Sequence, residues 1–222
     1  MRFFEILLAF SLALGAFARA GEPWRSAYDS ISARGDAPYY KTRIYRVDLE
    51  DLTPTQYSVG MGEVRKRQAD IEDMDKDELR RYLKKKVGTV IVGPGEEFWL
   101  VDGHHLATAL LRAGNEEMLV RVADWSRLTR AQFRARMIRE KKVWLYDNRG
   151  NELEGGFDDL PKKLTGLKDD PFRSLAYFVR KKGGFKATKV PFAEFMWANF
   201  FRTRVRSDDL ESAIRLSRSP EA

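Results

Sequence analysis

The sequence predicts an α/β fold of the α+β kind: a small mixed sheet with helices, followed by a mainly helical C-terminal region. Between residues 42 and 125, short runs of β-branched and aromatic residues alternate with amphipathic helical segments. Beyond residue 125 the apolar residues recur mostly at helical spacing, and Pro opens two of the segments. The chain has no cysteine, so a hydrophobic core must supply its stability, and thiol chemistry is excluded.

Residues 1–20 have the pattern of a secretory signal peptide. Met1-Arg2 precedes an apolar run over residues 3–17, and Ala18-Arg19-Ala20 is a small-x-small cleavage pattern. A spanning helix needs about 20 apolar residues, and this run is shorter. We therefore expect cleavage after Ala20, a periplasmic or secreted protein, and no stable membrane span once the signal is removed. An uncleaved anchor is the alternative.

The expected elements follow in chain order from a leader at residues 21–41, which mixes Gly, Pro, Ser and charge and should be loosely ordered. The α/β domain, residues 42–125, should contain a strand at 43–49, a turn at 52–56, a short helix at 63–71, a helix at 74–86 capped by Asp75 with Glu78, a hairpin of strands 89–92 and 98–101 with a five-residue loop, a helix at 106–113, and a strand at 118–123.

The C-terminal region, residues 126–222, should be mainly helical and pack on or beside that domain. Its expected elements are a basic helix at 129–140, an extended piece at 143–146, a turn at 148–150, an irregular stretch at 160–170, helices at 171–181 and 191–202 with Pro in the first turn, and a final helix at 208–216.

Charge is distributed unevenly along the chain. Residues 21–125 carry 16 Lys/Arg and 19 Asp/Glu, whereas residues 126–222 carry 22 and 13. A basic half can attract a polyanion such as nucleic acid through its summed field. An ordinary solvated surface explains the same numbers.

The chemically distinctive segment is Asp102-Gly103-His104-His105, which holds the only two histidines of the chain at a strand-to-helix turn. Gly103 allows a tight turn, and the start of the next helix favours an anion. Histidine can bind phosphate or move a proton near neutral pH. Asp102 could orient an imidazole or hold a divalent metal, Mg²⁺ or Mn²⁺. Alternatively, Asp102 only caps the helix, with one histidine packed and the other solvated.

Four separated blocks resemble the ParB-like nuclease family of the ParB/sulfiredoxin superfamily. They are residues 53–64, residues 101–106 (Val-Asp-Gly-His-His-Leu), residues 170–176 and residues 190–195. The resemblance covers about Ile44 to Phe201. Members of the superfamily bind nucleotides, transfer or hydrolyse phosphoryl groups, or bind or cut DNA, so the resemblance implies a ParB/sulfiredoxin-like sheet and a phosphate site.

The resemblance also implies roles for individual residues. His105 would contact phosphate, and His104 would take the place of a cysteine in sulfiredoxins or a glutamate in partition proteins. Leu106 replaces an arginine of those relatives, which argues against triphosphate binding, and the lack of cysteine excludes sulfinic acid repair. Glu63 would be the base or a metal ligand, by analogy with free serine kinases, and Gln56 and Gly60 belong to the motif that closes over the ligand. A helix N-terminal carboxylate is the simpler role of Glu63.

Three functions remain open at this point. The first is an exported nuclease or phosphodiesterase that uses His104, His105, Glu63 and Asp102, with nucleic acid held by the basic C-terminal helices. The second is a non-catalytic module that binds a phosphorylated small molecule or a protein. The third, a small-molecule phosphotransferase, needs a nucleotide donor that is scarce outside the cytoplasm.

Overall fold

The computed structural model describes residues 29–31 and 43–219. The predicted signal peptide and most of the predicted leader lie outside the described residues. The strands are β1 (Asp29–Ile31), β2 (Tyr45–Asp48), β3 (Leu52–Pro54), β4 (Ser58–Val59), β5 (Gly88–Val92), β6 (Phe98–Asp102), β7 (Glu117–Asp124) and β8 (Lys168–Asp169). The α-helices are α1 (Met61–Glu72), α2 (Lys76–Lys85), α3 (His104–Arg112), α4 (Arg130–Arg139), α5 (Pro171–Lys181), α6 (Ala193–Arg202) and α7 (Leu210–Arg218). Within this part of the chain, no helix is long and apolar enough to cross a membrane.

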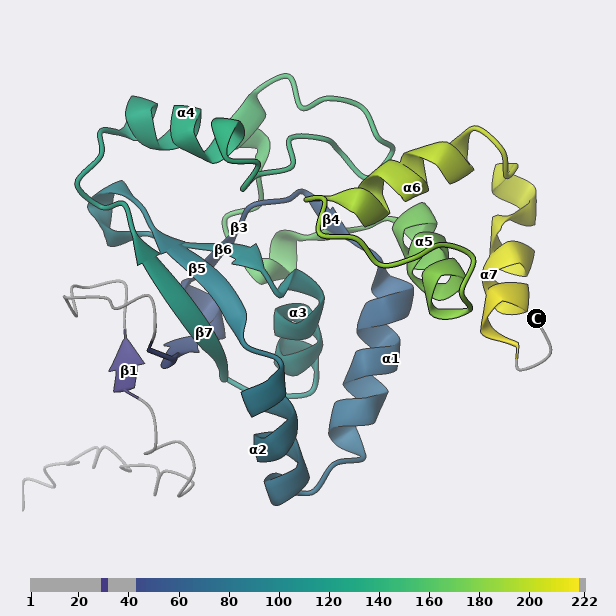
Figure 1. Cartoon of the computed structure of the whole chain (residues 1–222), viewed down its shortest axis with the longest axis horizontal. Coiled ribbons are helices and arrows are strands. Elements are labelled where there is room, and N and C mark those ends of the chain that lie inside the picture. The colour runs from purple at the N-terminus through teal and green to yellow at the C-terminus, as the bar shows by residue number, and fades with distance from the viewer. Residues whose placement is uncertain (1–28, 32–42, 220–222) are drawn as a thin grey trace, which may run out of the picture.

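Six of the strands form one mixed sheet in the order β1-β2-β7-β5-β6-β3 (Figure 1). The predicted hairpin is confirmed, because β5 pairs antiparallel with β6 across residues 93–97. β5 also pairs in parallel with β7. The fold class predicted from the sequence, a small mixed sheet with helices and a helical C-terminal region, is therefore confirmed.

The sheet buries both faces, each in its own apolar cluster. Val90, Val92 and Leu100 point into the larger cluster, which contains buried residues of α1, α2 and α3. Ile91 and Trp99, which alternate with them, point into a second cluster with Phe133 and Met137 of α4 and buried residues from the stretch 143–160. The alternation follows from the two-residue period of a strand. Strand β6 ends at Asp102, and α3 begins two residues later at His104.

Several helix boundaries agree with the predicted caps. Asp75 caps α2 and completes a capping box with Glu78, and Asp170 caps α5 with Pro171 at its first position. The prediction for Pro191 is wrong, because α6 begins at Ala193. Phe192 precedes it in a left-handed conformation, φ 59°, and its ring lies 5.3 Å from the ring of Trp144, so the chain turns before the helix starts.

Other elements differ from the sequence-based expectation. Residues 52–54 form β3, paired with β6, where a turn was expected, and residues 29–31 of the expected leader form β1 beside β2. These short strands carry no periodicity of their own and depend on a neighbour for their hydrogen bonds. α1 begins at Met61, two residues before the expected start, and α3 begins at His104, so both histidines lie inside the helix.

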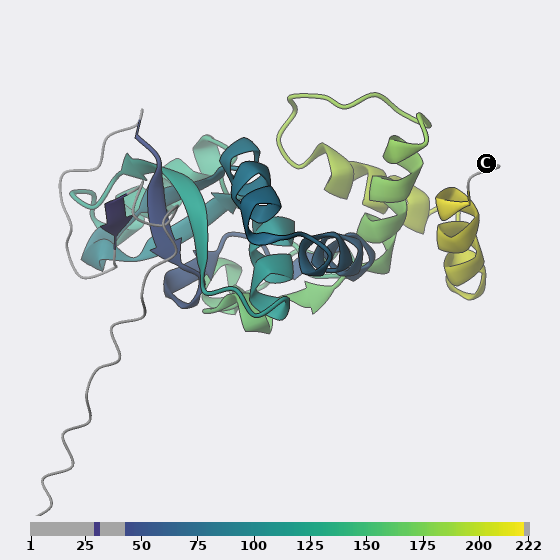
Figure 2. The ribbon, with the colours of Figure 1, turned by 90° about the horizontal axis from the view of Figure 1, so that it is seen from below.

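Helix α5 packs directly on α1. β4 pairs in parallel with β8, and the Met61 and Gly62 amides at the start of α1 donate to the side chains of Asp169 and Ser174. α6 and α7 in turn pack on α5, while the connection between α5 and α6 arches away from the helices (Figure 2). Residues far apart in the sequence therefore meet where α1, α3, α5 and α6 converge.

Candidate functional site

Gly103 turns the chain from β6 into α3. Its φ of 100° is a left-handed value that a residue with a side chain rarely adopts, and an added Cβ would lie 3.3 Å from the Cα of Gly88. Because Gly103 itself is the N-cap residue, no side chain caps the helix. The first N–H groups of α3 therefore lack a side-chain cap, and a helix start of this kind favours an anion.

His104 is buried and neutral. Its Nε2 accepts a hydrogen bond from the backbone N–H of Thr55 at 3.1 Å. Burial lowers its pKa to about 3, because the charged imidazolium would lose its hydration; a hydrogen bond with the Leu100 backbone opposes the shift. His104 thus joins the first turn of α3 to the end of β3.

His105 is also neutral, and it faces α1. Its Nε2 accepts the backbone N–H of Gly60 at 3.0 Å and lies 3.6 Å from Oε2 of Glu63. Burial, followed by the positive charges of Arg173 and Arg67, holds the pKa of His105 well below its usual range. A neutral ring that accepts at Nε2 carries its proton on Nδ1.

Glu63 is a buried carboxylate held between two arginines. Its Oε1 accepts from Arg67, at 2.9 Å from Nε and 2.7 Å from Nη2. Its Oε2 lies 3.3 Å from Nη1 of Arg173, but the angles do not make a hydrogen bond, so both atoms are buried without a hydrogen-bond partner among the described residues. The pKa of Arg67 is raised, because the carboxylate of Glu63, with Tyr82, outweighs the cost of burial.

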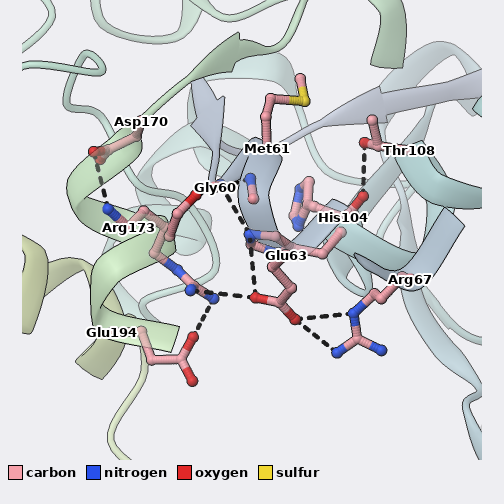
Figure 3. Close-up of polar contacts among 12 residues, drawn as sticks. Gly60, Met61, Glu63, Arg67, His104, Thr108, Asp170, Arg173 and Glu194 are labelled. Atoms are coloured by element: carbon pink, nitrogen blue, oxygen red, sulfur yellow. Dashed lines mark hydrogen bonds and ion pairs between the residues drawn. The ribbon is translucent and has the colours of Figure 1, made fainter. Parts of the chain in front are cut away.

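The chain of charges continues into α5 and α6. The guanidinium of Arg173 also pairs through Nη2 with Glu194, and the other oxygen of Glu194 pairs with Arg180. Figure 3 shows Arg173 between the two glutamates, with Arg67 on the far side of Glu63. Three arginines and two glutamates from three helices thus form one network of alternating charge.

This network lines a cavity of about 680 Å³ that also contains the turn at the start of α3. Its cationic lining residues are Arg67, Lys86, Lys141, Lys142, Arg173, Arg180 and Lys189, and its acidic ones are Glu63, Asp102 and Glu194. Seven cations against three anions leave a net charge of +4, since both histidines are neutral. The cavity has the size of a small-molecule site and the charge for an anion.

Six of the seven residues proposed from the sequence line this cavity: Gln56, Glu63, Asp102, Gly103, His104 and His105. The seventh, Gly60, contacts the cavity residue His105, because its backbone N–H donates to Nε2 of that ring. Asp102 is exposed at the end of β6 and does not cap α3, so the capping role considered for it is wrong. Gln56 is buried, and its amide donates to the carbonyl of Ser58 at 2.7 Å.

The donors do not fit the divalent metal that the sequence allowed. Across residues 29–31 and 43–219, no group of three His, Asp or Glu side chains is placed to share an ion. Both oxygens of Glu63 face arginines, whose charge repels a cation. The charge of this cavity therefore suits an anion and not a divalent cation.

The sequence did not single out Arg67, Arg173, Arg180 or Glu194. Arg173 lies inside the block Asp170-Pro171-Phe172-Arg173, which carried the family resemblance, and Glu194 lies inside the block at 190–195. The two blocks were the sequence signal for Arg173 and Glu194. Their roles depend on the packing of α5 against α1, which the sequence alone does not indicate.

The fold and the cavity together define a protein of the ParB-like class with a positively charged cavity. The chain matches the family described as "Putative ParB-like nuclease" over residues 45–203, and it belongs to this family. It is also similar to the crystal structure of protein Atu1540 from Agrobacterium tumefaciens, with 34% sequence identity and a TM-score of 0.69 over 81% of this chain and 94% of that one. A search of curated proteins found no match.

Proposed function

We propose that this protein binds the phosphate groups of a nucleotide or nucleic acid in the cavity and hydrolyses a phosphodiester bond there, as a nuclease or phosphodiesterase. The observation that carries the proposal is the approach of Glu63 to His105, 3.6 Å apart, inside a cavity with a net charge of +4. The family match supports the same reading.

Three features of the cavity support the proposal of phosphate binding. Nε and Nη1 of Arg173 are buried without hydrogen-bond partners among the described residues, and guanidinium groups match phosphate oxygens in geometry. The open first turn of α3 adds backbone N–H donors. The lysines of the lining add charge that attracts the ligand at longer range.

Hydrolysis would use His105 as the proton acceptor. Arg173 and Arg67 hold its pKa low in the free protein, and a bound phosphate would offset their charge and raise that pKa. As water oxygen attacks phosphorus, its proton would pass to Nε2 once the Gly60 N–H releases that atom. The leaving oxygen would take a proton from solvent, and the arginines would stabilise the charge on the phosphoryl oxygens.

A second candidate, a binding module without turnover, has its own observation. Both imidazoles already accept backbone N–H groups at Nε2, from Thr55 and Gly60, and Glu63 is held by arginines. In that arrangement His104 and His105 shape the turn and do not move protons. The ligand would then be a phosphorylated small molecule or a protein partner.

We further propose that the protein works in the periplasm or outside the cell, on the basis of the signal-peptide pattern of residues 1–20. Nucleic acid released into that space would meet the basic C-terminal region first, since residues 126–222 carry 22 Lys/Arg and 13 Asp/Glu.

The test is the release of acid-soluble nucleotides from single- and double-stranded DNA and RNA, with Mg²⁺, Mn²⁺ or EDTA. We expect the protein lacking residues 1–20 to cleave at least one of these nucleic acids, and to do so in the presence of EDTA as well. The variant His105→Gln should lose the activity. Arg46→Gln, in the separate Arg46–Glu117 pair, should retain it. If the protein binds a ligand but cleaves no substrate in any arm, the binding module is favoured. If it shows no binding and no cleavage, the proposal is refuted.

A further inference from the structure

The carboxylate of Glu194 occupies a position between two arginines of the cavity. Glu194 lies in the first turn of α6, and its two oxygens pair separately with Arg173 and Arg180 of α5. All three residues line the cavity. A carboxylate therefore stands where two guanidinium groups converge, which is an arrangement that also suits an oxyanion from outside.

Arg173 has more hydrogen-bonding capacity than the protein uses. Its side chain is 9% exposed, yet Nε and Nη1 lack a hydrogen-bond partner among the described residues. Buried polar groups in native proteins are ordinarily satisfied. Unused donors on a buried arginine that lines a cavity therefore point to a ligand that supplies the missing acceptors.

We propose that Arg173 and Arg180 form the anion subsite of the ligand, and that Glu194 is an internal substitute that a ligand phosphate displaces. This inference rests on the proposed function, because it requires that the cavity binds phosphate. It adds that Arg173 and Arg180 are the cations that contact the ligand, and that Glu194 competes with the ligand for them.

Glu194 differs from the two arginines of α5 in its position, because it lies directly after an exposed segment. Residues 182–192, which precede α6, are almost all exposed. Glu194 itself is 19% exposed and can turn to solvent, where its charge is hydrated. Arg173 is more buried and has Glu63 on its other side, so it would stay in place when Glu194 leaves.

Glu194 also has a reason to be present without a ligand. Arg67 and Arg173 share the single carboxylate of Glu63, and buried cations that lack compensation are destabilising, so Glu194 supplies the second carboxylate of the network while the cavity is empty. Its negative charge near the start of α6 is favoured by the helix dipole. The same charge repels an incoming phosphate, so Glu194 should stabilise the empty protein and weaken ligand binding.

The experiment is calorimetric titration of the purified protein with inorganic pyrophosphate. Glu194→Gln keeps the side-chain size and removes the charge, and we expect it to bind pyrophosphate roughly tenfold more tightly than the natural sequence. Arg180→Gln should bind roughly tenfold more weakly. Glu117→Gln is the matched control: Glu117 also pairs with an arginine and is 21% exposed, but it lies on β7 and not on the cavity. The affinity of Glu117→Gln for pyrophosphate should equal that of the natural sequence.

The outcomes separate this inference from the function on which it rests. If the natural protein binds pyrophosphate and Glu194→Gln binds equally or more weakly, the role of Glu194 is wrong while phosphate binding stands. If no variant binds, both are wrong. Should Glu194→Gln not fold, as judged by circular dichroism, the folded Arg180→Gln variant decides: unchanged affinity there overturns the subsite.

Discussion

Nε2 of His105 and Oε2 of Glu63 lie 3.6 Å apart without forming an ion pair. The imidazole is neutral, because burial and the charges of Arg173 and Arg67 lower its pKa, and Nε2 accepts the N–H of Gly60. The carboxylate meanwhile faces both arginines. The protonation of His105 therefore depends on how strongly the arginines are engaged elsewhere.

Arg67→Gln should raise the pKa of His105. The substitution removes a positive charge that disfavours the imidazolium and leaves Glu63 less compensated, and both effects favour protonation. The chain has only two histidines, so NMR titration of the ring signals, assigned with His104→Gln, measures the shift directly. Arg46→Gln should leave the His105 signal unchanged; an equal shift in both variants would point to overall charge as the cause.

Stability should decrease as pH falls below the ordinary histidine pKa of 6.5. The folded pKa of His104 is lowered to about 3, so between these values protons bind the unfolded chain and not the native one, and stability present above pH 6.5 is lost on acidification. For His104→Gln we expect a pH slope of the free energy of unfolding that is smaller by up to about 1.4 kcal/mol per pH unit. Urea unfolding between about pH 7 and about pH 5 measures it, and identical slopes would contradict the buried neutral histidine.

Asp170→Ala should destabilise the protein by about 3 kcal/mol. Asp170 is fully buried, accepts the Arg173 N–H at 3.0 Å as the N-cap of α5, and pairs with Arg202 of α6. Asp209 is a useful control, because it is the N-cap residue of α7 but is exposed and makes no capping bond. Asp209→Ala should change stability by less than about 0.5 kcal/mol, and equal losses in denaturant unfolding would disprove the role given to Asp170.

Gly62→Ala should weaken the packing of α1 against α5. The new Cβ would lie 2.9 Å from Oγ and 3.0 Å from Cβ of Ser174, closer than side chains tolerate. We expect a loss of about 1–3 kcal/mol, despite the better helix propensity of alanine. Adding Ser174→Gly removes both Ser174 atoms and leaves only the 3.1 Å contact with Cε2 of Phe178, so the double variant should lose less than the two single variants summed. Strict additivity in thermal unfolding would show that the clash is relieved in another way.

Much of the fold could be predicted from the sequence because its signals are local. The capping box of α2, Pro171 at the start of α5 and the β5–β6 hairpin each depend on residues within a few positions of one another. β1 and β3 were missed because three-residue strands gain their hydrogen bonds only from a distant partner. Phe192 displaced the start of α6 for a similar reason, since its aromatic contact is with Trp144.

The candidate site was predictable in part for the same physical reason. The strand-to-helix turn at His104 and His105 is visible as a motif, and Glu63 follows from the family resemblance. The partners of Glu63 divide clearly: Arg67 lies one helical turn away, whereas Arg173 is brought in from α5 by packing. No local pattern indicates that the charge of Glu63 is shared with α5 and α6.

The pairing of Glu63 with Arg173 has a consequence for how this protein can vary. A site divided between α1 and α5 cannot be transferred to another scaffold by exchanging either segment alone, because each exchange would remove one of the two ion-pair partners of a buried charge. Substitutions at the two positions should therefore arise as matched changes, and the two parts of the chain should be inherited as one unit.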